Sequence, residues 1–210
     1  MADSSTITKE PTVKKTSKHP RTSPSPQLGN IRIIGGQWRG RKLPVVPAEG
    51  LRPTPDRVKE TVFNWLQFEL QDSYVLDLFA GSGSLGIEAL SRGARGVCFA
   101  ETWAPAVKQL EQNLATLGGA GQVYSKGAEE CLAAQQVHSV DVVFLDPPFA
   151  QGWLEKIIPQ LEAEKILKTG GWVYVESGTQ DNFSNFPATW RLHREKKAGQ
   201  VTFRLFQVED

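Results

Sequence analysis

The fold is decided by the stretch Val140-Asp141-Val142-Val143-Phe144-Leu145-Asp146-Pro147-Pro148-Phe149. Its apolar first part is typical of a buried strand, and the strand ends abruptly at two prolines. Consecutive prolines fix two φ angles and remove two backbone donors, so the chain leaves the sheet in one stiff shape. The corner presents a carboxylate, free carbonyls and an aromatic ring at the carboxyl edge of the sheet, where open α/β sheets bind ligands. Acceptors beside an aromatic ring favour a flat ligand that carries an amino group, such as a nucleobase.

A second motif lies about seventy residues earlier and has the order of a cofactor-binding βα unit. The apolar run Tyr74–Phe79 is followed by a glycine turn, Ala80-Gly81-Ser82-Gly83-Ser84-Leu85-Gly86, and then by a helical pattern through Ala94. Strand, glycine turn and helix in this order bring the backbone close to a bound cofactor.

Two kinds of cofactor fit the glycine turn. Gly81, Gly83 and Gly86 satisfy G-x-G-x-x-G, and Glu101 follows twenty residues after Gly81, which is also the pattern of a dinucleotide site. Asp77 would repel a pyrophosphate, whereas it would attract a cationic ligand. S-adenosylmethionine carries an ammonium and a sulfonium and has no phosphate, so the charges favour that cofactor.

Strands and helices alternate through most of the chain, which predicts a doubly wound α/β fold with a mostly parallel sheet. A helix is expected from Asp56, its capping residue, to about Leu70, and the last two strands are expected to form a hairpin around Ala198-Gly199. The other expected elements are Tyr74–Phe79, Leu85–Arg92, Gly96–Ala100, Ala104–Leu117, Gln122–Ser125, Ala128–Ala134, Val140–Leu145, Trp153–Ile166, Trp172–Glu176, Trp190–Lys197 and Gln200–Val208.

The N-terminal part divides into a basic tail and a β-hairpin. Residues 1–28 are mostly Ser, Thr, Lys and Pro, which bury too little apolar surface to order, so a disordered tail is predicted. Residues 29–50 are predicted to form a β-hairpin with a glycine-rich basic tip suited to a nucleic acid, and residues 51–210 the S-adenosylmethionine-dependent domain. Trp38 either stacks on a base or ribose of a nucleic acid or simply covers the edge of the domain.

Charge is unevenly distributed along the 210 residues. Residues 1–60 hold 12 Lys/Arg and 5 Asp/Glu, whereas residues 61–210 hold 12 Lys/Arg and 18 Asp/Glu, although the net charge of the chain is only +1. A basic front on an acidic body fits a polyanionic partner. Two cysteines and three scattered histidines indicate neither a disulfide framework nor a metal site. We expect no membrane span and no secretory leader, hence a cytoplasmic protein, and nothing in the sequence demands an oligomer, so a monomer is expected.

Together the two motifs resemble those of class I amino-methyltransferases. Further segments narrow the resemblance to the bacterial family that methylates guanine N2 of small-subunit (16S) ribosomal RNA, over about residue 31 to the C-terminus. These segments are Arg32-Ile33-Ile34-Gly35-Gly36, Arg52-Pro53-Thr54, Arg57, Glu60, Phe63-Asn64 and Leu85–Ala94. The resemblance implies a Rossmann-like, seven-stranded sheet, S-adenosylmethionine as cofactor, and ribosomal RNA or an assembling small subunit as partner.

The expected roles of the site residues follow from these motifs. Asp146 and the Pro147 carbonyl would hold the two hydrogens of the amine, Pro148 would stiffen the corner, and Phe149 would stack on the base. The resemblance places the cofactor against Asp77, Phe79, Ala80, Gly81, Ser82, Gly83, Glu101, Thr102, Gly127, Ala128 and Glu129, with no metal. Related enzymes often have an acid where this chain has Gly127, so the adenine contacts stay open between Glu129 and other groups. The RNA-facing set is Arg32, Trp38, Arg39, Arg41, Lys42, Arg52 and Arg57.

Other acceptors and other classes of protein remain as alternatives. Methyltransferases of adenine N6 or of a protein glutamine amide more often have Asn before the two prolines and Tyr after them, where this chain has Asp146 and Phe149. A nicotinamide-dependent oxidoreductase would leave Asp77 and the proline pair without a purpose. A non-catalytic RNA-binding factor would have no need of the Asp-Pro-Pro-Phe corner.

Overall fold

The protein is built around one seven-stranded sheet, seen in a computed structural model that describes residues 1, 29–47, 54–181 and 183–209. The strand order is β5-β4-β3-β6-β7-β9-β8. The pairs among β3 to β7 are parallel, whereas β9 runs antiparallel to both β7 and β8. The prediction of a mostly parallel sheet closed by a C-terminal hairpin is therefore confirmed. The strands are β3 (Tyr74–Asp77), β4 (Gly96–Ala100), β5 (Gly121–Tyr124), β6 (Val140–Leu145), β7 (Leu167–Gly178), β8 (Trp190–Ala198) and β9 (Val201–Val208).

Helices cover both faces of this sheet, and each face has its own hydrophobic core. On one face, side chains of α1, α2 and α3 pack with the N-terminal hairpin, and on the other face those of α4 and α5 pack against the sheet. Phe144 of β6 belongs to the first core and Val143 and Leu145 to the second, which explains the unbroken apolar run of this strand. The helices are α1 (Asp56–Trp65), α2 (Ser84–Ser91), α3 (Ala104–Leu117), α4 (Ala128–Ala133) and α5 (Trp153–Glu164).

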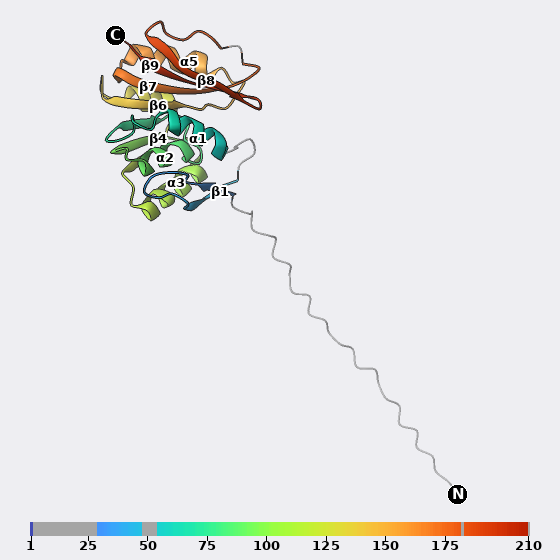
Figure 1. The fold of residues 1–210 in the computed structure, drawn as a ribbon. Coiled ribbons are helices and arrows are strands. Elements are labelled where there is room, and N and C mark those ends of the chain that lie inside the picture. The colour runs from blue at the N-terminus through green and yellow to red at the C-terminus, as the bar shows by residue number, and fades with distance from the viewer. Residues whose placement is uncertain (2–28, 48–53, 182, 210) are drawn as a thin grey trace.

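The predicted N-terminal hairpin is present as β1 (Gly29–Arg32) and β2 (Lys42–Val45), which pair antiparallel. It packs beside α3, near one end of the molecule, while β8 and β9 lie at the other end (Figure 1). Polar contacts fix it to the domain: the Ile34 N–H donates to Glu88 Oε2 at 2.8 Å, and Lys59 Nζ donates to the Arg32 carbonyl at 2.6 Å. The predicted disordered tail lies outside the described residues, apart from Met1, and so do residues 48–50 of the predicted hairpin segment.

Two local predictions were wrong. The first helix ends at Trp65, and the chain continues in turns to Leu70, because the backbone at Leu66 (φ −94°, ψ 11°) has left helical geometry. Leu66 and Leu70 are nevertheless buried, so the apolar period was correct while the backbone was not. Asp56 does not cap this helix: Pro55 occupies the cap position and the helix has no side-chain capping bond. Among the described residues no helix has the length and apolarity needed to cross a bilayer.

Candidate active site

The glycine turn after β3 is held at the point where the strand order reverses, between β3 and β6. The Leu78 N–H donates to the Phe144 carbonyl at 3.2 Å, and the Ala80 N–H donates to the Ala100 carbonyl at 3.0 Å. The turn therefore bridges the ends of β6 and β4. Gly81 and Gly83 have φ values of 50° and 75°, which favour glycine, and a Cβ at Gly83 would also lie 2.4 Å from Leu110 Cδ1. This crevice is where doubly wound sheets bind their cofactors.

Asp77 closes β3 and supports the start of α2. Its side chain is buried, and Oδ2 accepts a hydrogen bond from the Gly86 N–H at 3.0 Å. Burial raises the pKa of Asp77 to about 7, with the charges of Asp146 and Glu101 adding to the rise and the Gly86 hydrogen bond opposing it. A bound cation would favour the ionised form, as expected for a ligand with an ammonium and a sulfonium.

Glu101, which follows β4, braces the glycine turn from the other side. Its Oε2 accepts from the Gly81 N–H at 2.8 Å and its Oε1 from the Trp103 N–H at 2.7 Å. Each carboxylate oxygen retains a lone pair, so Glu101 can still accept from ribose hydroxyls. Thr102 beside it is exposed, and Phe79 packs edge-to-face on Trp153 at a ring separation of 5.5 Å.

Ser84, at the start of α2, was not among the predicted cofactor residues. Its hydroxyl is buried and has no hydrogen-bond partner among the described residues, a rare state for a buried polar atom. It directly follows the Phe79–Gly83 loop, where a cofactor could supply the partner. The unpartnered hydroxyl, the glycine turn and the two acids Asp77 and Glu101, which come at the ends of adjacent strands, together fit S-adenosylmethionine.

The structure shows the surroundings of the residues that were expected near the adenine of the cofactor. Glu129 forms an ion pair with Lys156 of α5 at 2.8 Å, so its carboxylate already has a partner. The Gly127 N–H donates to Glu130 Oε2 at 3.1 Å, and Ala128 is buried in the second core. Glu129 therefore behaves as a first-turn helix acid, and the structure gives it no exclusive role toward an adenine.

Asp146 directly follows β6 on the same edge of the sheet. Its Oδ2 accepts a hydrogen bond from Thr54 Oγ1 at 3.4 Å. Burial raises its pKa to about 6, and the Thr54 hydrogen bond limits the rise. Asp146 is therefore mostly ionised above pH 6, and a nearby sulfonium would favour that form further.

Glu176, near the end of β7, is a candidate site residue that the sequence interpretation did not include. Leu145 pairs with Val175, so the next residues, Asp146 and Glu176, come level with each other on adjacent strands. Glu176 is buried and accepts a hydrogen bond from Tyr174 Oη at 2.5 Å. Burial raises the pKa of Glu176 to about 8, and the charge of Asp146 adds to the rise.

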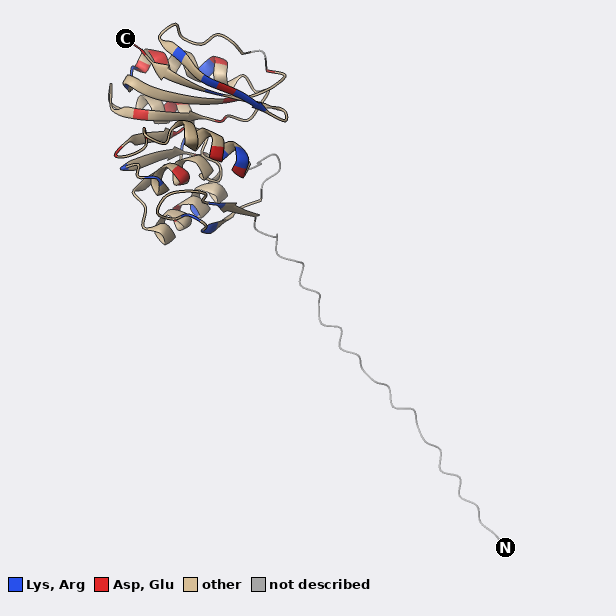
Figure 2. Ribbon diagram, in the orientation of Figure 1, with Lys and Arg blue, Asp and Glu red and all other residues tan. Residues whose placement is uncertain are grey.

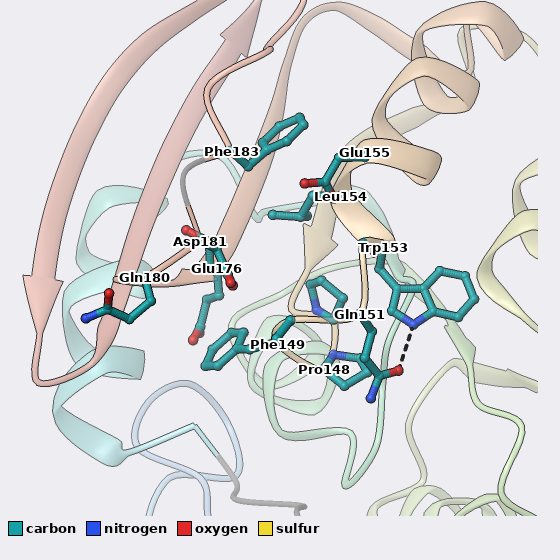
Figure 3. A pocket seen from close by; sticks show the side chains of 14 residues that line it. Pro148, Phe149, Gln151, Trp153, Leu154, Glu155, Glu176, Gln180, Asp181 and Phe183 are labelled. Atoms are coloured by element: carbon teal, nitrogen blue, oxygen red, sulfur yellow. Dashed lines mark hydrogen bonds between the residues drawn. The ribbon is translucent and has the colours of Figure 1, made fainter.

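An open pocket of about 340 Å³ is lined by Glu176 and by Pro147, the residue that directly follows Asp146. Figure 3 shows Glu176 pointing toward Phe149, whose ring is 41% exposed, large for an aromatic side chain. An exposed ring beside an acid offers a stacking surface and an acceptor to the same ligand. The other residues that line the pocket include Pro148, Trp153, Leu154, Asp181 and Phe183.

Comparison with known proteins identifies the family. Residues 31–207 match the family described as conserved hypothetical protein 95. The chain belongs to this family. It is 52% identical to ribosomal RNA small subunit methyltransferase D of Escherichia coli K12, over 86% of this chain and 91% of that protein. The Haemophilus influenzae protein of the same name is 47% identical, over 85% of this chain and 94% of its own length. The solved structure of E. coli yhhF has a TM-score of 0.79 at 49% identity, covering 86% of this chain and 99% of that one. The resemblance inferred from the sequence is confirmed.

In the structure the predicted RNA-facing residues do not all lie in one place. Trp38, Arg39 and Arg41 lie at the carboxyl ends of α2 and α3: the Trp38 N–H donates to Ser91 Oγ at 3.0 Å, and Arg41 Nη2 donates to the Thr116 carbonyl at 3.3 Å. Helices between parallel strands return to the opposite edge of the sheet, so this group does not adjoin Asp146.

The remaining members of the set have different positions. Trp38 packs half-buried against the first core, which favours its covering role over base stacking. Arg32, Lys42 and Arg57 are exposed, and Arg57 lies in the first turn of α1, close in sequence to Thr54 and thus to Asp146. Arg52 lies outside the described residues.

Proposed function

We propose that this protein transfers the methyl group of S-adenosylmethionine to the exocyclic N2 of a guanine in small-subunit (16S) ribosomal RNA. The relatives named ribosomal RNA small subunit methyltransferase D support a ribosomal RNA substrate and a methyl-transfer reaction. The observation that carries the proposal is the acceptor-rich corner formed by Asp146, Pro147 and Glu176 beside the exposed ring of Phe149.

The corner suits an amine whose lone pair is delocalised into a ring. Asp146 and the Pro147 carbonyl would accept the two N2 hydrogens, which lets the nitrogen pyramidalise and direct its lone pair at the methyl group. The N–CH3 bond forms as the S–CH3 bond breaks, and the sulfur keeps the electron pair, leaving S-adenosylhomocysteine. Asp146 stabilises the cationic amine until its proton leaves, either to the Asp146 carboxylate or to water. Positioning and fixed charge supply the rate enhancement here.

Glu176 supports guanine over adenine as the acceptor. On the edge that carries N2, guanine presents the N1–H and N2–H2 donors side by side, whereas adenine presents an N1 acceptor beside its amine. With N2 held at Asp146, the carboxylate of Glu176, level with Asp146, would accept from N1–H in its ionised form. The pKa of Glu176 is raised to about 8 in the cofactor-free protein, so this contact depends on the sulfonium of the bound cofactor favouring ionisation. The same carboxylate would repel the N1 lone pair of adenine.

S-adenosylmethionine is the methyl donor, and the structure supports a site for it between the ends of β3 and β4. Asp77 and the Phe79–Gly83 loop would line its methionine part, and Glu101 would take the ribose hydroxyls. Thr102, Gly127 and Ala128 would flank the adenosine end. This arrangement leaves the sulfonium between the glycine turn and Asp146, which lie on the adjacent strands β3 and β6.

The wider partner is the RNA strand around the target base. The base would leave its stack to reach the corner, as in other enzymes that modify bases. We retain the prediction that Arg32, Arg39, Arg41, Lys42, Arg52 and Arg57 contact RNA, that the protein acts as a monomer, and that it works in the cytoplasm. Arg57 is the member best placed for the reacting base, since it lies in the turn that follows Thr54.

Isotope-labelled methyl transfer tests the proposal. The purified protein is incubated with S-adenosylmethionine carrying a labelled methyl group and with small-subunit ribosomal RNA, either free or in subunits that lack the modification. Nucleoside mass spectrometry is expected to find the label in N2-methylguanosine. Label in N6-methyladenosine, or in ribosomal protein instead of RNA, would exclude guanine N2 as the acceptor.

A further inference from the structure

The C-terminal hairpin reaches the same edge of the sheet as the candidate active site. Glu176 on β7 pairs with Phe203 on β9, and Phe203 pairs with Lys196 on β8. Asp146, Glu176 and Lys196 therefore lie in one row across four adjacent strands. Neighbouring strands are about 4.8 Å apart, so the backbone of Lys196 lies roughly 14 Å from that of Asp146.

Cations without a carboxylate partner gather at this end of the hairpin. Arg194, Lys196 and Lys197 are exposed and take part in no ion pair among the described residues. Within the part of the chain that the structure describes, Arg194 donates only to the neighbouring His193 carbonyl, at 3.3 Å. Figure 2 shows the basic residues along β8 leading to the β8–β9 turn, on the side of the molecule where α1 begins.

The basic residue at the other end of β8 is neutralised, since Arg191 pairs with Glu209 at 2.9 Å. Glu195, the one acid of β8, lies between Arg194 and Lys196 but pairs with Arg204 of β9 at 2.6 Å. Lysines on an edge strand can serve only to prevent sheet-to-sheet association. That role would not require the unpaired cations to lie at the end of the strand nearest the active site. Binding of a polyanion beside the active site would require it.

The two faces of the hairpin contribute differently. Directly paired residues project to the same face of a sheet, so Lys196 shares the face of Glu176 and Phe203, on which α1 and Arg57 also lie. Lys197 projects to the opposite face because successive side chains alternate. The unpaired cations thus lie on both sides of the edge, beside any strand whose base enters the pocket.

We propose that the end of the β8–β9 hairpin, through Arg194, Lys196 and Lys197, binds the phosphates of the RNA strand that flank the target base. The inference rests on the proposed function, since it requires an RNA substrate at the Asp146 corner. It assigns to the C-terminal hairpin a role in RNA binding that the sequence interpretation had given only to the N-terminal part.

The test compares three glutamine variants with a matched control variant on the same strand. The triple variant R194Q/K196Q/K197Q and the single variants K196Q and K197Q remove unpaired cations, whereas R191Q removes a paired one at the far end. RNA affinity is measured for each at several salt concentrations. Each lost phosphate contact with a single strand lowers the slope of log K against log salt by about 0.7, so the triple variant should lose about 2. At 0.1 M salt this corresponds to roughly 100-fold weaker binding.

Several controls keep the outcomes distinct. Cofactor affinity and the thermal midpoint should stay at the wild-type values in all four variants, and R191Q should keep the wild-type salt slope. An unchanged slope in the triple variant, or an equal loss in R191Q, would overturn the inference. If the wild-type protein methylates ribosomal RNA while the triple variant binds it normally, only this inference fails. If the wild-type protein methylates no RNA, the proposed function itself fails.

Discussion

Substituting Gly86 by alanine should both destabilise the fold and weaken cofactor binding. A Cβ at this position would lie 2.2 Å from Phe99 Cε1 and 2.9 Å from Val97 Cγ1, both buried in β4. Carbon atoms normally approach to about 3.5–4.0 Å, so α2 would have to move away from the sheet by more than about 1 Å. Overpacking of this kind costs up to about 3 kcal/mol.

The higher helix propensity of alanine offsets part of that cost. It returns about 1 kcal/mol, which leaves a net loss of about 2 kcal/mol in the free energy of unfolding. For a chain of this length the thermal midpoint should fall by about 4–8 °C. The shift also moves the Gly86 N–H away from Asp77, so affinity for S-adenosylmethionine should fall as well.

Calorimetric unfolding and cofactor titration measure the two effects. Gly118→Ala is the matched control, because nothing lies within 4 Å of its added Cβ. Its positive φ of 66° costs about 1 kcal/mol through backbone strain alone, with cofactor affinity unchanged. A Gly86→Ala protein with wild-type stability and cofactor affinity would refute the packing argument.

Three further predictions concern the site and its support. Ser84→Ala should leave the stability of the cofactor-free protein unchanged or raise it by about 1 kcal/mol, because the Ser84 hydroxyl has no partner among the described residues. Its affinity for the cofactor should fall several-fold. An unchanged affinity by titration would exclude a contact between Ser84 and the cofactor. Glu88→Ala should lower the free energy of unfolding, measured in urea, by about 3 kcal/mol, since buried Glu88 binds both Arg92 and the Ile34 N–H. A loss under about 1 kcal/mol would show that other contacts hold the N-terminal hairpin. Burial raises the pKa of Asp77 to about 7 and of Glu176 to about 8, whereas unfolded carboxyls titrate near pH 4. The folded state therefore holds extra protons between about pH 4 and 8, and the contribution of these groups to stability falls as the pH rises through that window. S-adenosylmethionine should raise the thermal midpoint more at pH 8 than at pH 6. S-adenosylhomocysteine lacks the sulfonium charge, so the rise that it causes should depend less on pH. Identical behaviour of the two ligands would argue against stabilisation of the ionised acids by the sulfonium.

Much of the fold and the centre of the site could be predicted because they depend on short, local patterns. The apolar run before Asp146 and the glycine turn after Asp77 each specify a strand and the turn in which it ends. The strand order then places both motifs at one edge, as parallel strands require. Glu176 could have been found by the same pattern as Asp77, Glu101 and Asp146, because each of these acids stands at the end of an apolar run.

Tertiary packing decided the features that could not be predicted. The tip of the N-terminal hairpin lies at the far ends of α2 and α3 because Trp38 packs there, and no local pattern specifies that docking. The turns after Trp65 preserve the apolar period of a helix, since Leu66 and Leu70 remain buried without one. The proximity of Lys196 to the active site depends on the register of three strand pairs, which sequence alone does not reveal.

The role of Asp146 in methyl transfer is tested by the single-turnover rate of Asp146→Asn at saturating cofactor and RNA. Asparagine keeps the size of the side chain and an acceptor for Thr54 but removes the charge that stabilises the cationic amine. Loss of that charge should lower the rate by about 100- to 1,000-fold, with the dissociation constant of S-adenosylmethionine nearly unchanged. A rate close to that of the wild-type protein would contradict that role.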